Sequence, residues 1–267
     1  MTWISGPLIS ALFATSAPAA VRSGKATVEW LTASATCEPG RSVQTAVRMV
    51  LDPSWHTYWL NPGEGGMKTT VEWELPAGWV AGELEHPVPE RFVSEGLVGF
   101  GYKGIVVFPV TLTAPADFSG DAILNGKLSW LTCDDSSCIP GNAEISLTLT
   151  AGTPAPTLNA GLITATQKLV PAENPAVILV VTEADGKLQL AIRLTRPGIC
   201  DPASSQVFPL THHAVEDAAE IQFVKSGDVW TASIPKSEYA DGPLTSLTLV
   251  LAGDGAPVAF STTWLKK

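Results

Sequence analysis

The sequence predicts an all-β protein built from two immunoglobulin-like β-sandwich domains in tandem. The chain carries 23 glycines and 21 prolines, which disfavour long helices and mark turns. Short segments of alternating apolar and polar residues recur along it, a pattern typical of half-buried strands. Apolar residues make up 45% of the 267 residues, enough to fill the cores of two domains of roughly 100–200 residues each.

The first predicted domain spans residues 23–151, where Pro-Gly, Asn-Pro-Gly and Gly-Gly turns separate short strands. The expected strands are Ala26–Ala33, Ser42–Leu51, His56–Leu60, Thr70–Leu75, Ile105–Ala114, Ala122–Thr132 and Ala143–Thr150. Short strands at this spacing are typical of an immunoglobulin-like sandwich.

A segment rich in proline and threonine, residues 152–160, breaks this pattern and is the predicted linker. The second, smaller domain covers residues 161–267 and begins with an expected helix, Gly161–Leu169, that ends before Pro171. Its expected strands are Val177–Glu183, Lys187–Thr195, Glu220–Lys225, Val229–Ile234, Leu244–Ala252 and Val258–Trp264.

Residues 1–22 resemble a secretory leader. The apolar run Leu8–Ala14 precedes the small-residue string Ala17–Ala20, as at a signal cleavage site, although no Lys or Arg precedes Arg22. Because no later apolar run approaches the ~20 residues that cross a bilayer, we expect an exported protein without a membrane span of its own.

The charge balance excludes nucleic acid as a partner. The chain has 16 Lys and Arg against 26 Asp and Glu, a net charge of −10. A surface this acidic is repelled by phosphate backbones.

The most informative motif is a pair of cysteines, Cys133 and Cys138, that flank four turn-forming residues at the end of a predicted strand. A hairpin loop of this length places its flanking Cα atoms about 4.5–5.5 Å apart, within reach of a disulfide. A ring this small stabilises the fold by only about 2 kcal/mol, so stability explains the bridge poorly. An exposed bridge is open to thiol–disulfide exchange, and a hairpin staple is the alternative.

The remaining chemistry is less defined. Asp134 and Asp135 disfavour a thiolate beside them, which fits a dithiol that stays inert until a partner docks, or simply a solvated turn. Cys37 and Cys200 lie in separate Gly/Pro-flanked loops and could form a structural disulfide between the domains, two unpaired thiols or a second redox pair.

No cofactor or metal site is expected. Adjacent histidines such as His212 and His213 point to opposite faces of a strand, and no cysteine lies at a zinc-finger spacing from them. Three methionines do not make a thioether-rich copper site. No nucleophile elbow, phosphate-binding loop or zinc-protease motif occurs, so hydrolase and nucleotide-enzyme functions have no support.

A series of motifs follows the chain in a characteristic order. Trp55–Gly66 (WHTYWLNPGEGG) comes first, followed by Pro89–Phe92, Gly101–Gly104, Phe108–Val110 and then the cysteine motif Cys133–Pro140. This order resembles the periplasmic N-terminal region of DsbD-type thiol:disulfide interchange proteins, in the ScsB-like branch linked to suppression of copper sensitivity. Gln206–Pro209 is similar to an element of that branch's second domain, so the likeness extends over both halves.

The resemblance implies a periplasmic thiol:disulfide oxidoreductase without a cofactor. It implies that two electrons pass from a thioredoxin-like donor domain to a client thiol protein, such as an isomerase, a peroxidase or a copper-related protein. Cys138 would form the mixed disulfide and Cys133 would resolve it. A cap loop within Phe92–Tyr102 would shield the pair, with Phe92, Phe100 and Tyr102 as shielding aromatics; the alternative is that these rings fill the core.

The extent of the whole protein and its function both have alternatives. Full-length members of the family continue into a multi-span membrane domain and a thioredoxin-like domain, so the chain is expected to be either a fragment or a module served by a separate membrane reductase. The alternative function is a non-catalytic immunoglobulin-like adaptor whose disulfide only pins a hairpin. A periplasmic copper-binding protein is a third possibility.

Overall fold

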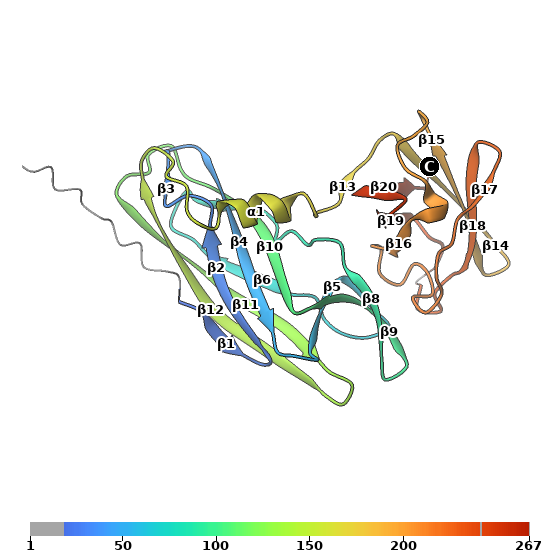
Figure 1. Ribbon diagram of the computed structural model, residues 1–267, viewed down its shortest axis with the longest axis horizontal. Coiled ribbons are helices and arrows are strands. Elements are labelled where there is room, and N and C mark those ends of the chain that lie inside the picture. The colour runs from blue at the N-terminus through green and yellow to red at the C-terminus, as the bar shows by residue number, and fades with distance from the viewer. Residues whose placement is uncertain (1–18, 241, 267) are drawn as a thin grey trace, which may run out of the picture.

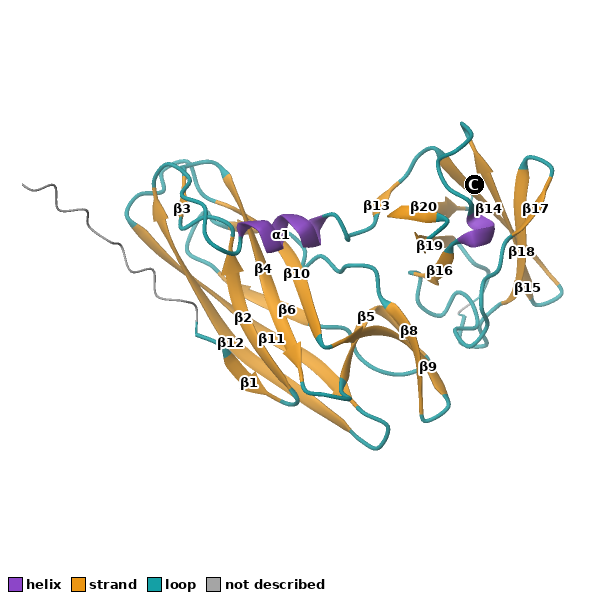
Figure 2. Ribbon diagram, viewed as in Figure 1, coloured by secondary structure: helices purple, strands orange, loops and turns teal. Residues whose placement is uncertain are grey.

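The computed structural model describes residues 19–240 and 242–266, and these form four β-sheets arranged as two pairs (Figures 1 and 2). The predicted all-β fold class is confirmed. Most of the expected leader lies outside the described residues, but its last two residues belong to a paired strand, β1. None of the described helices is long and apolar enough to cross a membrane.

The N-terminal pair of sheets encloses one core. The first sheet has the strand order β1-β2-β4-β10-β7, and the second has the order β3-β12-β11-β5-β9-β8, with β6 paired to β11. The strands are β1 (Val21–Ser23), β2 (Ala26–Thr32), β3 (Thr36–Cys37), β4 (Ser42–Leu51), β5 (His56–Gly63), β6 (Thr70–Glu74), β7 (Val80–Ala81), β8 (Glu90–Ser94), β9 (Leu97–Lys103), β10 (Ile105–Thr113), β11 (Asp121–Cys133) and β12 (Cys138–Ala151).

Large aromatic side chains fill the space between these two sheets. Trp30, Trp59 and Trp130 are fully buried there, together with the inward-facing aliphatic residues of β4, β10, β11 and β12. The alternation is clearest in β12, where every second side chain is buried over most of its length. Period-2 patterning therefore orients these strands, because one face of each sheet meets the core and the other meets solvent.

The short helix α1 (Ala160–Gln167) packs on the outside of the N-terminal pair. Its Ile163 is fully buried against Leu31, Ala46 and Val107 of the first sheet. The sequence predicts this helix at the start of the second domain, after the linker 152–160. The structure instead binds the linker to the first sheets through backbone hydrogen bonds from Ala35 to Ala155 and from Thr157 to Ala33.

The C-terminal pair of sheets has the orders β13-β20-β19-β16 and β14-β15-β18-β17 and encloses a separate core. Its elements are β13 (Ala172–Glu173), β14 (Val177–Ala184), β15 (Lys187–Leu194), the 3-10 turn Pro202–Ser204, β16 (Gln206–Pro209), β17 (Val224–Ser226), β18 (Val229–Pro235), β19 (Ser246–Gly253) and β20 (Ala256–Leu265). The strand expected over Glu220–Lys225 is mostly wrong, because residues 220–223 form no strand; Ile221 and Phe223 pack into the C-terminal core instead.

One buried histidine stands out in the N-terminal pair. His86 lies in the loop between β7 and β8, where its ring packs 4.9 Å from the ring of Phe108 and its Nδ1 lies 2.9 Å from the Leu84 carbonyl. Its Nε2 is buried and has no partner. Burial lowers the pKa of His86 to about 4, because a charged imidazolium there would lose its hydration without gaining a counter-ion.

Candidate functional site

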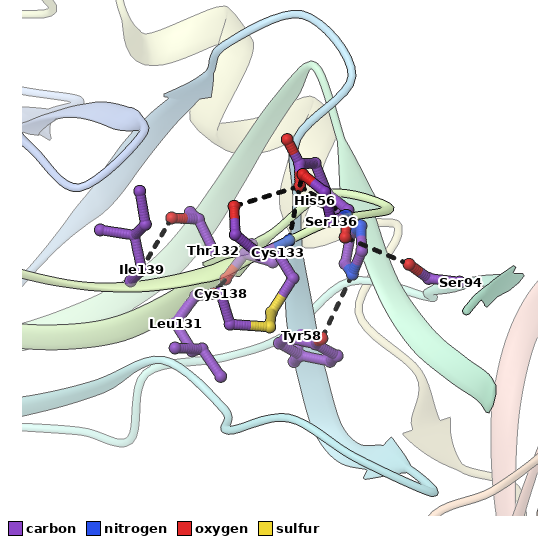
Figure 3. Close-up of a disulfide and its surroundings, with 12 residues drawn as sticks. His56, Tyr58, Ser94, Leu131, Thr132, Cys133, Ser136, Cys138 and Ile139 are labelled. Carbon is purple, nitrogen blue, oxygen red and sulfur yellow. Dashed lines mark hydrogen bonds between the residues drawn. A yellow bond between two sulfur atoms is a disulfide. The ribbon is translucent and has the colours of Figure 1, made fainter. Parts of the chain in front are cut away.

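The β11–β12 hairpin brings the two cysteines of the motif together. Cys133 and Cys138 are opposite each other in the strand register and form a disulfide with a Cα–Cα distance of 4.1 Å. The loop between them is closed by Asp134, whose backbone N–H donates to the Ser137 carbonyl and whose Oδ1 accepts from the backbone N–H groups of Ser136 and Ser137 (Figure 3). These hydrogen bonds lower the pKa of Asp134, so the loop carries a fixed negative charge.

The two sulfur-bearing residues differ in exposure. Cys133 is 2% exposed, whereas Cys138, on the other side of the loop, is an exposed residue. Thiol–disulfide exchange starts by attack on a sulfur that the incoming thiolate can reach. Of the two cysteines, Cys138 is therefore the one more accessible to a thiolate from outside.

Strand β5 lies beside the disulfide. His56 is the cross-strand partner of Cys133, so the two side chains project from the same face of the sheet. The His56 Nε2 and the Tyr58 hydroxyl lie 3.2 Å apart (Figure 3). Burial is the main cause that lowers the pKa of His56 and raises the pKa of Tyr58, so both side chains are neutral near pH 7. The register places His56, the first residue of a strand expected from the sequence, beside Cys133.

The segment expected to be a cap loop is a β-hairpin. Strands β8 and β9 pair through residues 90–101, and the hairpin turns at Glu95 and Gly96, which both have positive φ. The Phe92 ring of β8 packs 4.2 Å from the ring of His56. The Ser94 hydroxyl is 3.3 Å from the Asp134 carbonyl and 3.2 Å from an Asp135 carboxylate oxygen (Figure 3). We call residues 90–103 the cap hairpin.

The three aromatic residues expected to shield the disulfide have different surroundings. Phe92 is partly buried and covers His56. Phe100 and Tyr102 belong to the N-terminal core: Phe100 is 2% exposed, and the Tyr102 hydroxyl donates to the Pro87 carbonyl at 2.8 Å. Phe92 is thus the ring placed at the site, and the alternative of core-filling rings describes Phe100 and Tyr102.

Gly101 of the cap hairpin is packed against β5 without space for a side chain. A Cβ at this position would lie 1.9 Å from the Thr57 carbonyl oxygen. We expect Gly101→Ala to push β9 away from β5 and to lower the free energy of unfolding by about 2 kcal/mol or more, as overpacking does. Denaturant unfolding measures this change.

The matched control is Gly161→Ala in α1, where a Cβ meets nothing within 4 Å. Alanine favours helix over glycine, so this variant should be neutral or slightly more stable, by up to about 1 kcal/mol. Equal effects of the two substitutions would show that the close approach of β9 to β5 does not contribute to stability.

The structural disulfide expected between Cys37 and Cys200 is not formed, and both are free cysteines. Cys37 is buried in the N-terminal core, where its Sγ lies 3.5 Å from the Arg41 carbonyl. Cys200 packs against the C-terminal core, and burial raises its pKa to about 11. The two thiols pack in different cores, so the loops that carry them do not come together.

Within the described residues, no group of three or more His, Cys, Asp or Glu side chains is arranged to hold a metal ion. His212 and His213, expected to point apart on a strand, lie in a turn with ring centroids 3.7 Å apart.

Residues 27–150 match the family model described as "Thiol:disulfide interchange protein DsbD, N-terminal". These residues are therefore similar to the DsbD N-terminal family. The match covers the disulfide hairpin, β5 and the cap hairpin, and the resemblance drawn from the motifs is confirmed. The family is one of thiol:disulfide interchange proteins. No curated protein matches the sequence significantly.

Similarity to a solved structure extends over both pairs of sheets. The crystal structure of the N-terminal periplasmic domain of ScsB from Proteus mirabilis is similar, with a TM-score of 0.66 and 22% identity over 90% of this chain and 93% of that chain. This likeness confirms the immunoglobulin-like fold class. A protein of unknown function from Porphyromonas gingivalis W83 covers 91% of this chain and 100% of its own at 13% identity, but its TM-score of 0.29 is too low to carry an argument.

Proposed function

We propose that this chain is a periplasmic thiol:disulfide exchange module that passes two electrons from a thioredoxin-like donor domain to a client protein through Cys133 and Cys138. The observation that carries the proposal is the unequal exposure of the two cysteines in a small disulfide ring. Such a ring stabilises the fold little, and its exposed half is placed for attack by a thiolate from outside. The match of residues 27–150 to the DsbD N-terminal family supports the same chemistry.

The reduction proceeds in two exchanges. A donor thiolate attacks the Cys138 sulfur, a donor–Cys138 disulfide forms, and the Cys133–Cys138 bond breaks. The electron pair of that bond goes to the Cys133 sulfur, which takes up a proton. The donor's second thiol loses its proton and attacks the donor's first sulfur, so the donor leaves as a disulfide and Cys138 is released as a thiolate.

Transfer to the client runs the same steps in reverse. The Cys138 thiolate attacks the client disulfide, and one client sulfur leaves with the electron pair. Cys133 loses its proton and attacks Cys138, which restores the module's disulfide and releases the client's second sulfur. The client is a thiol protein such as an isomerase, a peroxidase or a copper-handling protein. The donor belongs to a membrane reductase, either on a separate chain or as part of the same protein.

Reduction of the folded protein tests this proposal. Reduced thioredoxin, used as the probe donor, is expected to reduce the Cys133–Cys138 bond while the near-UV circular dichroism of the fold is retained. Mass spectrometry after thiol alkylation should show two additional labels, both on the β11–β12 hairpin. The control is the Cys138→Ala variant, which has no such bond and should gain no labels from thioredoxin treatment.

The adaptor function predicts a different result. A disulfide that only pins the hairpin would be reduced by thioredoxin only after denaturant unfolds the chain. That outcome would overturn the exchange function.

A further inference from the structure

Strand β8 of the cap hairpin has two faces with different partners. Phe92 and Ser94, two residues apart, project from one face toward the disulfide site, where they contact His56 and Asp135. Arg91 projects from the opposite face. Its guanidinium reaches the segment between β16 and β17 of the C-terminal pair of sheets.

The Arg91 contacts join the cap hairpin to that segment. The Arg91 Nη2 donates to the Ala218 carbonyl at 2.9 Å, and Nη1 lies 3.6 Å from the Glu220 carboxylate. The Glu220 side chain is largely exposed, so the ion pair contributes little. A charged donor on a backbone carbonyl is the stronger and more directional of the two interactions.

The neighbouring strands β5 and β9 are fixed to the same C-terminal part. The fully buried Asn61 of β5 donates from Nδ2 to the Pro209 carbonyl at 2.8 Å and to an Asp217 carboxylate oxygen at 3.2 Å. The Phe208 ring packs at 6.0 Å from the ring of Phe100 in β9 and is itself part of the N-terminal core. The C-terminal sheets therefore contact β5, β8 and β9, which are the strands that surround the disulfide.

These contacts differ in strength. Asn61 and Phe208 are buried, whereas the Arg91 side chain is 29% exposed and lies on the outer strand of the cap hairpin. Among the described strands, β8 is the last of its sheet and pairs with β9 alone. Among the described contacts of its outward face, the Arg91 interactions are those that oppose its movement away from the site.

We propose that Arg91 is a positioning residue that ties the cap hairpin to the C-terminal pair of sheets, so that Phe92 and Ser94 stay over the disulfide until a partner displaces them. The C-terminal sheets thereby set how often the cap opens. This inference rests on the proposed exchange function, because opening of the cap matters only if a partner must reach the disulfide. The position of the cap can still be measured without any redox partner.

The test uses the full chain with Cys138→Ala, in which Cys133 is a free thiol beside His56, the residue that Phe92 contacts. Iodoacetamide is the probe, and peptide mapping measures alkylation at each cysteine separately. Adding Arg91→Ala is expected to raise the alkylation rate of Cys133 about tenfold, because loss of a charge-assisted hydrogen bond increases the open population by that order. Arg91→Lys, which keeps the charge but loses the planar fork, should give a smaller increase.

Three controls accompany this measurement. Cys37 is buried in the core away from the cap and reports global unfolding in the same peptide map. Arg22→Ala removes an arginine–carboxylate pair with Asp52 on the β1 side of the protein and should leave the Cys133 rate unchanged. In a Phe92→Ala background, Arg91→Ala should add little, because the ring through which it acts is already missing.

An unchanged Cys133 rate in Arg91→Ala would overturn the inference. A parallel rise at Cys37 would overturn it too, because Arg91 would then stabilise the whole fold rather than the cap. Because alkylation needs no partner, failure of thioredoxin to reduce the native disulfide would count against the proposed function while the alkylation result still decides the role of Arg91.

Discussion

The Cys138→Ala variant is expected to lose covalent capture of partners, whereas the Cys133→Ala variant should accumulate mixed disulfides with them. In the Cys133→Ala variant the exposed Cys138 attacks a partner disulfide, and the mixed disulfide persists because no second thiol resolves it. In Cys138→Ala the remaining cysteine of the pair, Cys133, is 2% exposed, so capture should fall by about 100-fold or more, since exchange requires access to the sulfur. Non-reducing electrophoresis followed by mass spectrometry measures both.

The captured partners should include an oxidised thioredoxin-like domain and proteins of a periplasmic extract. A variant with both Cys133 and Cys138 replaced is the blank, because any adducts that it forms must come through Cys37 or Cys200. Equal capture by the two single variants would show that the difference in exposure does not decide which sulfur reacts. Absence of capture by Cys133→Ala with any partner, the thioredoxin-like domain included, would contradict the exchange function.

Acid should destabilise the protein through His86. The unfolded chain takes up a proton at the ordinary histidine pKa of 6.5, while the folded chain does so only at about 4. Between these values the unfolded state binds more protons, so stability is complete above pH 6.5 and declines as the pH falls toward 4. A shift of this size corresponds to about 3 kcal/mol. Denaturant unfolding at a series of pH values measures the decline.

His86→Phe isolates this contribution. Phenylalanine keeps an aromatic ring beside Phe108 but does not titrate. The stability difference between variant and wild type should shift in favour of the variant by about 3 kcal/mol from pH 7 to pH 4. The carboxylates and His56 titrate in both proteins and cancel in the difference. Parallel pH curves for the two proteins would show that His86 is protonated equally in the folded and unfolded chains.

The regular strands and the disulfide could be predicted because each depends on local pattern. Ser42–Leu51 matches β4 at both ends, since strict burial on one face imposes the alternation that the sequence carries. The loop between Cys133 and Cys138 consists of turn-forming residues, which fixed the hairpin register and thus the pairing of the two cysteines.

The cap hairpin could not be predicted because glycine obscures its strand pattern. Gly99 and Gly101 interrupt the alternation of β9, and glycine usually indicates a turn. Here both residues permit close approach: a Cβ on Gly99 would lie 2.5 Å from the Phe92 ring, and one on Gly101 would meet the backbone of β5. The reason for these glycines is a tertiary contact, which a single sequence does not display.

The contacts between the two pairs of sheets could not be predicted from the sequence either. In the sequence, nothing distinguishes Asn61 and Arg91 from other polar residues of strands or loops. Their hydrogen-bond partners lie more than a hundred positions away in the chain. The positions of Cys37 and Cys200 depend on the same long-range packing. Loop composition alone favoured a disulfide between them over two separate thiols, whereas their packing in separate cores leaves both thiols free.

The burial of Cys133 beside the exposed Cys138 has a kinetic consequence for the proposed exchange. With one sulfur open to solvent, donor and client must occupy the same place in turn and never together. A ping-pong rate law follows, in which an excess of either partner competes with the other. Throughput is then greatest at balanced concentrations of the two.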